Sequence, residues 1–482
     1  VVEAGGDFEV HGLAYDSRRV RPGDLFVAVR GYRSDGHDYA AEAAGRGAAV
    51  ALERPLSLPP GTPWLHLGDT RWGLGELAAE LQGRPARRLL MAGVTGTNGK
   101  TTVTHMAAHV LESAGLPTGF LSTVAQRAGV EVSDNRSGQS TMESPEVQEA
   151  LARMEAGGMR AAVVETTSHA LLQGRVSACD FDVVAVTGVG HDHLDYHGSW
   201  DAYLRAKALI IELCAAGTPK GVVKTAVLNR DDASFARLSE YAVPHRLDYA
   251  LEGPARLGAG DLVCGPAGSR FSIQHEGERH PVSLALPARF NVSNALCAAG
   301  ICLSLGLSLE QVCEGLSSFP GIRGRLERVD LGQPFAVYVD FAHAAGALAS
   351  VLAELRPLAS DRLLAVFGST GRADHDRPGM GRAAAQGADW FVITTDDPVG
   401  EDPAEIARQV ASGAEGRVLG RDYELEPDRR KAIRRAFELA RPGDVVLLAG
   451  KGHERSMILV GGSEPWDERA EAEAALRALG YS

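Results

Sequence analysis

The chain has 482 residues, which is too long for a single hydrophobic core and predicts two to four domains. Apolar residues make up 45% and charged residues 23%, as in a soluble globular protein, and the formal net charge of −13 argues against a general nucleic-acid binder. No apolar run reaches the ~18 residues of a membrane span and no signal peptide is visible, so we expect a cytoplasmic protein that binds neither nucleic acid nor membrane.

The first part of the chain combines short strand-like runs with glycine turns. The apolar runs at 24–29 and 48–52 are typical of strands. The basic stretch LQGRPARR at 81–88 contains glycine and proline, which favours a connection between domains. We therefore predict a first α/β domain over residues 1–87.

A glycine loop follows the next predicted strand, at 89–94. The loop GVTGTNGKTT at 93–102 leads into a helix pattern over 100–114. Glycines let backbone N–H groups turn inward around phosphate, and the start of a helix adds partial positive charge. Lys100 can reach the β- and γ-phosphates and Thr101 can bind Mg²⁺, although the loop is shorter than the usual phosphate loop. We predict that ATP phosphates bind Gly96, Thr97, Asn98, Gly99, Lys100, Thr101 and Thr102.

Two further predicted strands end in polar residues. Glu165 ends the apolar run that begins at residue 161, and the stretch TGVGHDHLDYHG at 187–198 follows another strand. Because the carboxyl ends of parallel strands share one edge of a sheet, these groups should lie beside the phosphate loop. A His/Asp cluster alone is more often structural, but three converging strand ends favour a metal site that bridges ATP and a second substrate.

Strand and helix patterns alternate along the rest of the chain, which predicts mostly parallel sheets covered by helices. The stretch FPGIRGR at 319–325 is a second predicted boundary, and the runs at 363–367, 391–394 and 445–449 are strands of a further unit. The predicted fold class is α/β, with a central ATP-binding domain over 88–320 and a Rossmann-like C-terminal domain over 321–482. The six cysteines lack CxxC spacing, and we interpret them as buried thiols in a reducing compartment.

The stretch ITTDDPVG at 393–400 places two acids side by side at the end of a buried strand. Adjacent carboxylates repel each other, so we expect a cation or an amine near Asp396 and Asp397. A solvated acidic turn is the alternative, because Asp-Asp-Pro is also a common turn sequence.

Together these motifs resemble the Mur ligase family, and especially its MurE type, which adds the third amino acid to UDP-N-acetylmuramoyl-L-alanyl-D-glutamate. The resemblance runs almost end to end, and it is carried by DSRRVRPGDLFVAVRG, STV, TGTNGKTT, TSHALLQGRV, DHLDYHG, YLRAK, FNVSNA, GRLE, VDFAHAAGAL, RPGMG, DRRKAI and GKGHE. It implies ATP and a UDP-muramoyl-dipeptide as substrates, Mg²⁺ as cofactor, a UDP-binding first domain and a C-terminal domain that holds the amino acid and closes over ATP. We also expect a monomer.

The resemblance assigns roles residue by residue. Catalytic roles fall to Lys100, Lys207 and His193. The Mg²⁺ ligands would be Thr101, Glu165, His193 and Lys207 in carbamoylated form. The nucleotide would also contact Asn291, Asn294, Arg325, Asp340 and His343. The UDP-dipeptide would contact Ser17, the region from Gly31 to His37, Ser122, Ser140, Thr141, Ser168 and Arg175. The incoming amino acid would meet Asp396, Asp397, Val399 and Glu454.

The acidic turn bears on the choice of amino acid. Family members that add meso-diaminopimelate carry Asp-Asn-Pro-Arg there, and the arginine clamps the second carboxylate. This chain has Val399, which offers no donor, and Asp397, which favours an ammonium group. We therefore favour a basic amino acid with one carboxylate, L-lysine or L-ornithine, with a slight preference for ornithine. Diaminopimelate is the alternative, with Arg372 or Arg377 as the clamp.

The chain departs from the family pattern in TGVGHDHLD, in FAHAAGAL, in the shortened FGSTGRADHDRPGMG and after GKGHE. Another ligase of the superfamily, including a folylpolyglutamate synthase, is a rival, but the opening stretch resembles a UDP-sugar domain. A non-catalytic nucleotide-binding module is a rival from another class. It predicts loss of Lys100, Glu165, His193 or Lys207, all of which are present.

Overall fold

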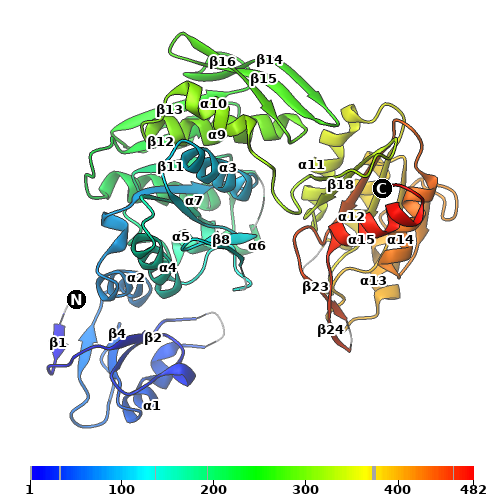
Figure 1. The fold of residues 1–482 in the computed structure, drawn as a ribbon. Coiled ribbons are helices and arrows are strands. Elements are labelled where there is room, and N and C mark those ends of the chain that lie inside the picture. The colour runs from blue at the N-terminus through cyan, green and yellow to red at the C-terminus, as the bar shows by residue number, and fades with distance from the viewer. Residues whose placement is uncertain are drawn as a thin grey trace. The chain divides into compact units, whose positions relative to one another are not determined.

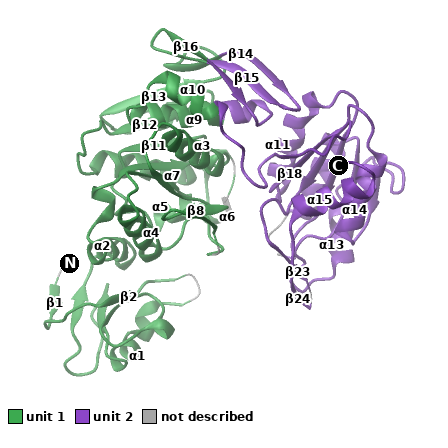
Figure 2. Ribbon diagram, in the orientation of Figure 1, with its two compact units in different colours: residues 1–259, 273–280, 294–316 green, residues 260–272, 281–293, 317–482 purple. Residues whose placement is uncertain are grey.

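The computed structural model describes residues 3–31, 34–135, 137–190, 192, 194–371, 376–459 and 461–482. The chain forms two compact units, coloured separately in Figure 2. The first comprises residues 1–259, 273–280 and 294–316, and the second comprises residues 260–272, 281–293 and 317–482. Among the described residues, every helix is too short or too polar to cross a lipid bilayer.

The first sheet is built from the N-terminal residues (Figure 1). Its strands are β1 (Glu3–Gly5), β2 (Gly12–Ala14), β3 (Asp24–Val27), β4 (Ala49–Leu52) and β5 (Trp64–His66), in the spatial order β1-β5-β4-β3-β2. Successive residues of a strand point to opposite faces. Phe26 therefore packs with α1 (Ala40–Gly45), whereas Leu25 and Val27 pack with Leu74 of α2 (Thr70–Leu81). The short helices η1 (Ser17–Arg19), η2 (Gly36–Tyr39) and η3 (Pro85–Arg87) lie in the connections.

The second sheet has eleven strands in the order β16-β15-β14-β13-β12-β11-β6-β10-β7-β8-β9. They are β6 (Leu90–Thr95), β7 (Thr118–Leu121), β8 (Ala125–Arg127), β9 (Val132–Asp134), β10 (Ala161–Glu165), β11 (Val183–Val186), β12 (Thr225–Asn229), β13 (His245–Ala250), β14 (Leu257–Gly265), β15 (Gly268–His275) and β16 (Glu278–Leu284). Strand β6 lies between β10 and β11 and is parallel to both. The carboxyl ends of these three strands therefore meet at one edge.

Helices cover this sheet. They are α3 (Lys100–Ser113), α4 (Ser144–Ala156), α5 (Ser168–Leu172), α6 (Leu194–His197), α7 (Trp200–Ala216), α8 (Phe235–Leu238), α9 (Arg289–Ser304) and α10 (Leu309–Ser317). Leu151 of α4 and Ile210 of α7 share a buried apolar core with Met91 of β6 and Val164 of β10. The central parallel strands β7, β10 and β11 are buried on both faces, as expected for parallel strands between helices, whereas the edge strand β9 is exposed.

The third sheet forms the centre of the second unit, in the order β17-β18-β22-β19-β20-β21. Its strands are β17 (Glu327–Val329), β18 (Ala336–Asp340), β19 (Leu363–Phe367), β20 (Trp390–Ile393), β21 (Tyr423–Leu425) and β22 (Val445–Ala449), and only the β17–β18 pair is antiparallel. Helices α11 (Ala345–Leu355), α12 (Arg377–Gly387) and α13 (Pro403–Ala411) share one core with Phe367, and α14 (Arg429–Leu439) and α15 (Glu468–Ala478) share another with Val366. The helix η4 (Arg356–Leu358) and the hairpin β23 (Ser456–Leu459) and β24 (Gly462–Pro465) complete the unit.

The predicted α/β class with mostly parallel sheets is confirmed. The strand predicted at 89–94 is β6, one residue later, and the helix predicted over 100–114 is α3. All six cysteines are free thiols, and five of them are buried. The boundaries at 87/88 and 320/321 stay predictions, since the first compact unit holds the first sheet together with most of the second.

Candidate active site

The phosphate loop joins β6 to α3. A side chain at Gly96 would place its Cβ 1.8 Å from Thr187 Oγ1, and one at Gly99 would place it 2.4 Å from Asn294 Oδ1. Both glycines have positive φ angles, 151° and 83°, so the sequence needs glycine there for two reasons. Lys100 Nζ donates to the carbonyl oxygens of Gly96 and Thr97, at 2.9 Å each. The ammonium of Lys100, which is predicted to bind phosphate, is therefore held against the backbone of the loop.

The carboxylate of Glu165 lies at the end of β10, beside the phosphate loop. Thr101 Oγ1 donates to its two oxygens at 3.0 Å, and Thr123 donates to them through its N–H at 2.9 Å and its hydroxyl at 2.8 Å. Glu165 is 2% exposed. A buried carboxylate surrounded by hydroxyl groups offers the oxygen ligands that Mg²⁺ prefers. Thr123, which sequence reasoning did not select, lies in the STV stretch, and His193 lies outside the described residues.

Lys207 lies inside the unit, although a lysine on a helix ordinarily extends to solvent. It is 1% exposed, and its Nζ donates to Gly96 O at 2.7 Å and lies 4.5 Å from the centre of the Tyr203 ring. Burial, together with the charge of Lys100, holds the pKa of Lys207 well below its ordinary value. Burial therefore favours the neutral form of this amine, which touches the phosphate loop.

Arg175 follows α5 and is held by several acceptors. Its guanidinium donates to Thr141 O at 2.8 Å and to the side-chain oxygens of Gln139 and Gln173, and it pairs with Glu143 at 2.8 Å. Sequence reasoning did not identify these partners, because Gln139, Thr141 and Glu143 come from the distant loop before α4. Thr141 Oγ1 in turn donates to the backbone carbonyl oxygen of Glu165 at 2.9 Å, so Thr141 links the arginine to the end of β10.

The other predicted UDP-substrate residues are spread over the first unit. Ser122, Ser140 and Thr141 line one small cavity together with Glu165. Ser168 Oγ lies 3.1 Å from His197 Nε2. The structure therefore brings the residues that follow β7 and β10 together.

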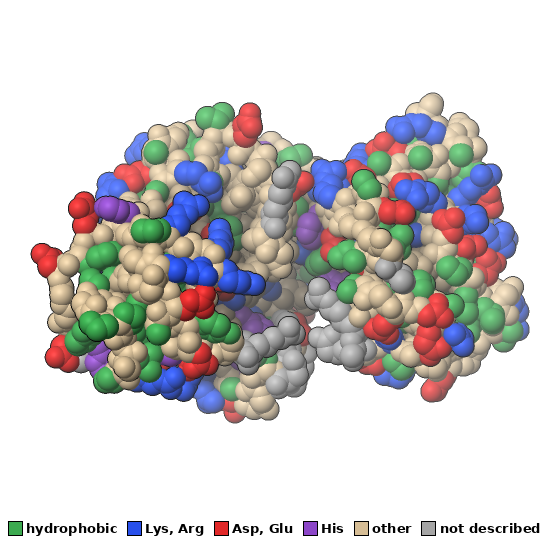
Figure 3. Space-filling model, turned by 90° about the horizontal axis from the view of Figure 1, so that it is seen from below, with side chains coloured by type: hydrophobic (Ala, Val, Ile, Leu, Met, Phe, Trp, Pro, Cys, Tyr) green, Lys and Arg blue, Asp and Glu red, His purple; other side chains and the backbone are tan. Residues whose placement is uncertain are grey.

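Ser17 and His37 lie in the short helices η1 and η2, which connect strands of the N-terminal sheet. His37 is buried and hydrogen-bonds through Nδ1 to Asp35 at 2.6 Å, while Ser17 O accepts from Arg46 at 2.8 Å. Arg71 donates to Gln173 at 3.4 Å, which links this sheet to the surroundings of Arg175. In Figure 3 several Lys and Arg side chains lie together on the first unit, at the left of the view, with acidic side chains beside them. Residues 32 and 33 lie outside the described residues.

In the second unit, three sequence-distant motifs come together around Phe341. The Arg325 guanidinium lies 5.1 Å from the centre of its ring, and the rings of His343 and His453 lie 4.5 Å and 4.6 Å away. Asp340 is buried, which raises its pKa, and accepts from the N–H groups of Leu326 and Ala342 at 2.9 Å each. Arg325, Asp340 and His343, predicted separately, therefore form one cluster.

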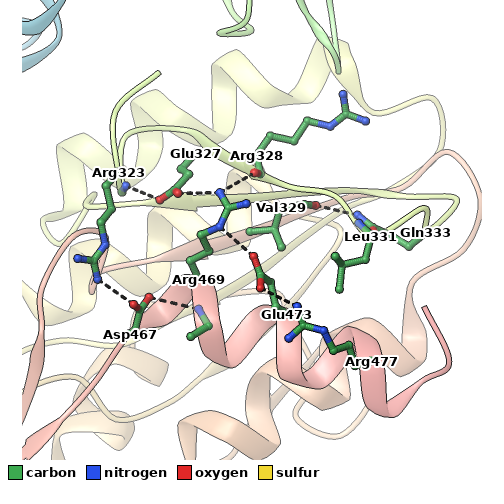
Figure 4. A network of polar contacts seen from close by, with 12 residues as sticks. Arg323, Glu327, Arg328, Val329, Leu331, Gln333, Asp467, Arg469, Glu473 and Arg477 are labelled. Carbon is green, nitrogen blue, oxygen red and sulfur yellow. Dashed lines mark hydrogen bonds and ion pairs between the residues drawn. The ribbon is translucent and has the colours of Figure 1, made fainter. Parts of the chain in front are cut away.

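Around this cluster the backbone is tightly packed. A Cβ at Gly324 would lie 2.2 Å from His453 N, so only glycine lets the two loops approach. Figure 4 shows that residues 323–327 are bound to α15 and the residue before it. Glu327 accepts from Gly324 N and from Arg469, both at 2.8 Å. Arg323 pairs with Asp467 at 3.3 Å.

The two predicted nucleotide asparagines lie on α9. Asn291 is buried and donates to Pro287 O at 2.8 Å. Asn294 lies beside Gly99, with its side-chain oxygen 2.4 Å from the position a Cβ would take there.

A buried lysine from another part of the chain lies beside the acidic turn. Lys451 Nζ lies 2.8 Å from Asp397, 2.7 Å from Glu454 and 3.7 Å from Asp396, and Lys451 is fully buried. The prediction of a compensating cation therefore holds, but the group that sequence reasoning missed is a lysine of the same chain. Its signal was the stretch GKGHE, which places Lys451 after β22 as the two acids follow β20.

Two side chains near the turn bear on a carboxylate clamp. Val399 is 47% exposed and adopts a positive φ of 47°, which is strained for a β-branched residue. Arg377 pairs with Glu401 at 2.9 Å and donates to Gln409 at 2.7 Å and Thr370 O at 3.0 Å, so its guanidinium is already occupied. Arg372 lies outside the described residues.

Comparisons with known families and proteins agree on one family. The model of the Mur ligase middle domain matches residues 94–302, that of the Mur ligase, glutamate ligase domain matches residues 324–452, and that of the Mur ligase family, catalytic domain matches residues 9–57. A UDP-N-acetylmuramyl-tripeptide synthetase of Roseiflexus sp. (strain RS-1) is 43% identical, over 98% of this chain and 96% of the relative.

Further relatives carry a more specific name. A UDP-N-acetylmuramoyl-L-alanyl-D-glutamate--2,6-diaminopimelate ligase of Solibacter usitatus (strain Ellin6076) is 38% identical, over 98% of this chain and 94% of the relative. A solved structure of a protein with that ligase name has a TM-score of 0.71 and 30% identity, and the match covers 98% of this chain and 96% of the other.

Proposed function

This chain belongs to the Mur ligase family and is an ATP-dependent ligase, and we propose that it adds the third amino acid to UDP-N-acetylmuramoyl-L-alanyl-D-glutamate. The observation that carries the proposal is the buried Glu165 carboxylate, held by Thr101 and Thr123 directly beside the phosphate loop. This arrangement suits the positioning of a triphosphate opposite a second, anionic substrate. The names of the full-length relatives supply the identity of that substrate.

The proposed reaction has two steps. The carboxylate of the UDP-dipeptide attacks the γ-phosphate of ATP, which gives an acyl phosphate and ADP. The amine of the incoming amino acid then attacks the acyl carbon, and phosphate leaves. Lys100 and the N–H groups of the loop offset the charge on the transferred phosphoryl group. Mg²⁺, held by Thr101, Glu165, His193 and carbamoylated Lys207, would neutralise further charge on the phosphate oxygens.

ADP release tests the proposal against its rivals. We expect ADP only when ATP, the UDP-dipeptide and a diamino acid are all present, because the acyl phosphate must be consumed for turnover. A folylpolyglutamate synthase would instead need a folate, and a non-catalytic nucleotide-binding module would release no ADP with any mixture. Either result would overturn the proposal.

We further propose that the amino acid is L-ornithine or L-lysine. Val399 offers no donor for a second carboxylate, and Arg377 is engaged by Glu401 and Gln409. In a competition at equal concentrations, ornithine or lysine should therefore be incorporated ahead of meso-diaminopimelate. Ornithine and lysine differ by one methylene, worth only ~1 kcal/mol. Preferential incorporation of diaminopimelate, as the names of the relatives suggest for those proteins, would contradict this part alone.

Arg175 is proposed to bind a carboxylate of the UDP-dipeptide. Its planar guanidinium is held by Gln139, Gln173 and Thr141 O and pairs with Glu143 at 2.8 Å, a carboxylate whose place the substrate carboxylate would take. A lysine would keep the charge but lose the fork of parallel donors. We expect Arg175→Lys to raise the KM for the UDP-dipeptide by about 10-fold or more and to change the KM for ATP by less than about 2-fold.

Steady-state kinetics with each substrate varied in turn would check the Arg175 prediction. The exposed Arg237, which pairs with Asp201 at the surface, provides the matched Arg237→Lys control. Equal effects of Arg175→Lys on both KM values, or no effect on either, would refute the assigned role.

A further inference from the structure

Lys451 partly neutralises the negative charges of the acidic turn. Asp397 Oδ1 accepts from Lys451 Nζ at 2.8 Å and from Ile458 N at 2.8 Å, and Glu454 pairs with Lys451 at 2.7 Å. An ammonium group has three donors and no acceptor, so it matches a group of carboxylates. Asp397 and Glu454 were predicted to meet the incoming amino acid. In the structure both are bound to the ammonium of Lys451.

Lys451 and the two aspartates follow neighbouring parts of one sheet edge. The turn follows β20, Lys451 follows β22, and β19 lies between these strands. The three carboxylates of Asp396, Asp397 and Glu454 have oxygens within 4.8 Å of one another. Without Lys451, the buried Asp396 and Asp397 and the partly exposed Glu454 would lie close together with less compensation, and the repulsion between their charges would be strong at low effective dielectric.

Asp396 shows how tight this site is. It is 1% exposed, neither of its carboxylate oxygens has a hydrogen bond in the described part of the chain, and the ammonium 3.7 Å away is its ion-pair partner. A Cβ at Gly450 would lie 2.4 Å from Asp396 Oδ2, so glycine is needed for the approach of the two loops. Among the described residues, Lys451 forms ion pairs within 4.0 Å with all three acids.

From this geometry we propose that Lys451 is a specificity-determining residue, a built-in counter-cation that sets how negative the amino-acid pocket is. Its ammonium reduces the charge of the acidic turn and so limits the repulsion of a distal carboxylate on the incoming amino acid. Lys451 acts through Asp397 and Glu454, as a positioning residue, and needs no contact with substrate. The inference rests on the proposed function for the placement of the amino acid at this turn.

The test compares two substitutions of opposite sign. Lys451→Met removes a positive charge and keeps most of the length of the side chain, while Asp397→Asn removes a negative charge at the same contact. The measured quantity is the ratio of kcat/KM for ornithine to that for meso-diaminopimelate. We expect Lys451→Met to raise this ratio and Asp397→Asn to lower it, each by about 10-fold, since one buried charge changes the local potential strongly.

The double variant Asp397→Asn/Lys451→Met completes the cycle. Its ratio should return to within about 3-fold of the wild-type ratio, because the two charges are removed together. Both single variants lose the same contact, so a purely structural role would shift the ratio in one direction or leave it unchanged, and either result would overturn the proposal. The exposed Lys431 gives the matched control Lys431→Met, for which the ratio should not change.

Hydrogen exchange at two amides provides a second test that does not depend on catalytic activity. Ile458 N is bonded to Asp397, and Val399 N donates to Ile458 O at 3.4 Å. Hydrogen exchange at these two amides should accelerate in Lys451→Met and be restored by Lys451→Arg. If exchange is unchanged, the proposed role of Lys451 is wrong, whatever the function of the protein. If wild type releases no ADP with any diamino acid while exchange responds as expected, the proposed function fails instead.

Discussion

Replacing Lys207 by alanine is expected to lower kcat by about 1,000-fold or more, the size of effect seen when a group that stabilises transition-state charge is removed. Lys207 is buried, its amine touches Gly96 O of the phosphate loop, and burial lowers its pKa, which favours the neutral form of the amine. A neutral amine can attack CO₂, with formation of an N–C bond and loss of one proton, which yields the carbamate proposed above. Burial thus prepares this lysine for modification.

Small carboxylates should restore part of the activity of Lys207→Ala, because they can occupy the space left by the carbamate. Initial rates of ADP release with and without formate or acetate would measure the restoration. Lys431→Ala, at an exposed lysine of α14, is the control and should turn over as wild type does. Wild-type turnover of Lys207→Ala would show that the assignment of the metal site is wrong.

Arg429→Met is expected to reduce the free energy of unfolding by about 3–5 kcal/mol, the usual cost of leaving one charge of a buried pair uncompensated. Arg429 and Glu468 are 1% and 0% exposed at their side chains and are joined at 2.6–3.0 Å. Arg429 also donates to Ala449 O at 2.7 Å and Thr395 O at 3.4 Å. Its loss would therefore loosen the turn that carries Asp396 and the loop that carries Lys451.

Denaturant unfolding would measure this effect, and the neighbouring arginine gives a close control. Arg430 lies on the same helix and pairs with Glu471 of α15, but its side chain is 54% exposed. Arg430→Met should change stability by less than about 1 kcal/mol, as exposed pairs do. The double variant Arg429→Met/Glu468→Met should be more stable than Arg429→Met alone. A small effect of Arg429→Met would contradict the importance of the buried pair.

Much of the first unit's site could be predicted because it follows from strand order along the chain. Parallel strands place their carboxyl ends at one edge, so Glu165 after β10 had to approach the loop after β6 once the two strands paired. Glycine spacing likewise identified the phosphate loop without a structure. These features depend on local sequence and on one topological rule.

The remaining features depend on pairings that sequence does not specify. Lys451 meets Asp397 only because β22 and β20 both flank β19, an order that no local pattern reveals. Glu143 contacts Arg175 from the loop before α4. Thr123 contacts Glu165 from the short connection between β7 and β8. In each case the charge or hydroxyl was visible in the sequence, but its partner was not.

The central position of β6 has a consequence for synthesis on the ribosome. β6 is the earliest strand of its sheet to emerge, yet its two neighbours are β10, which begins at Ala161, and β11, which begins at Val183. At about 5–20 residues per second, the ribosome needs roughly 3–13 s after Thr95 to reach Ala161. During that interval an almost wholly apolar strand has no partner on either side. Nascent chains of this length are therefore the species in which chaperone binding or aggregation is expected.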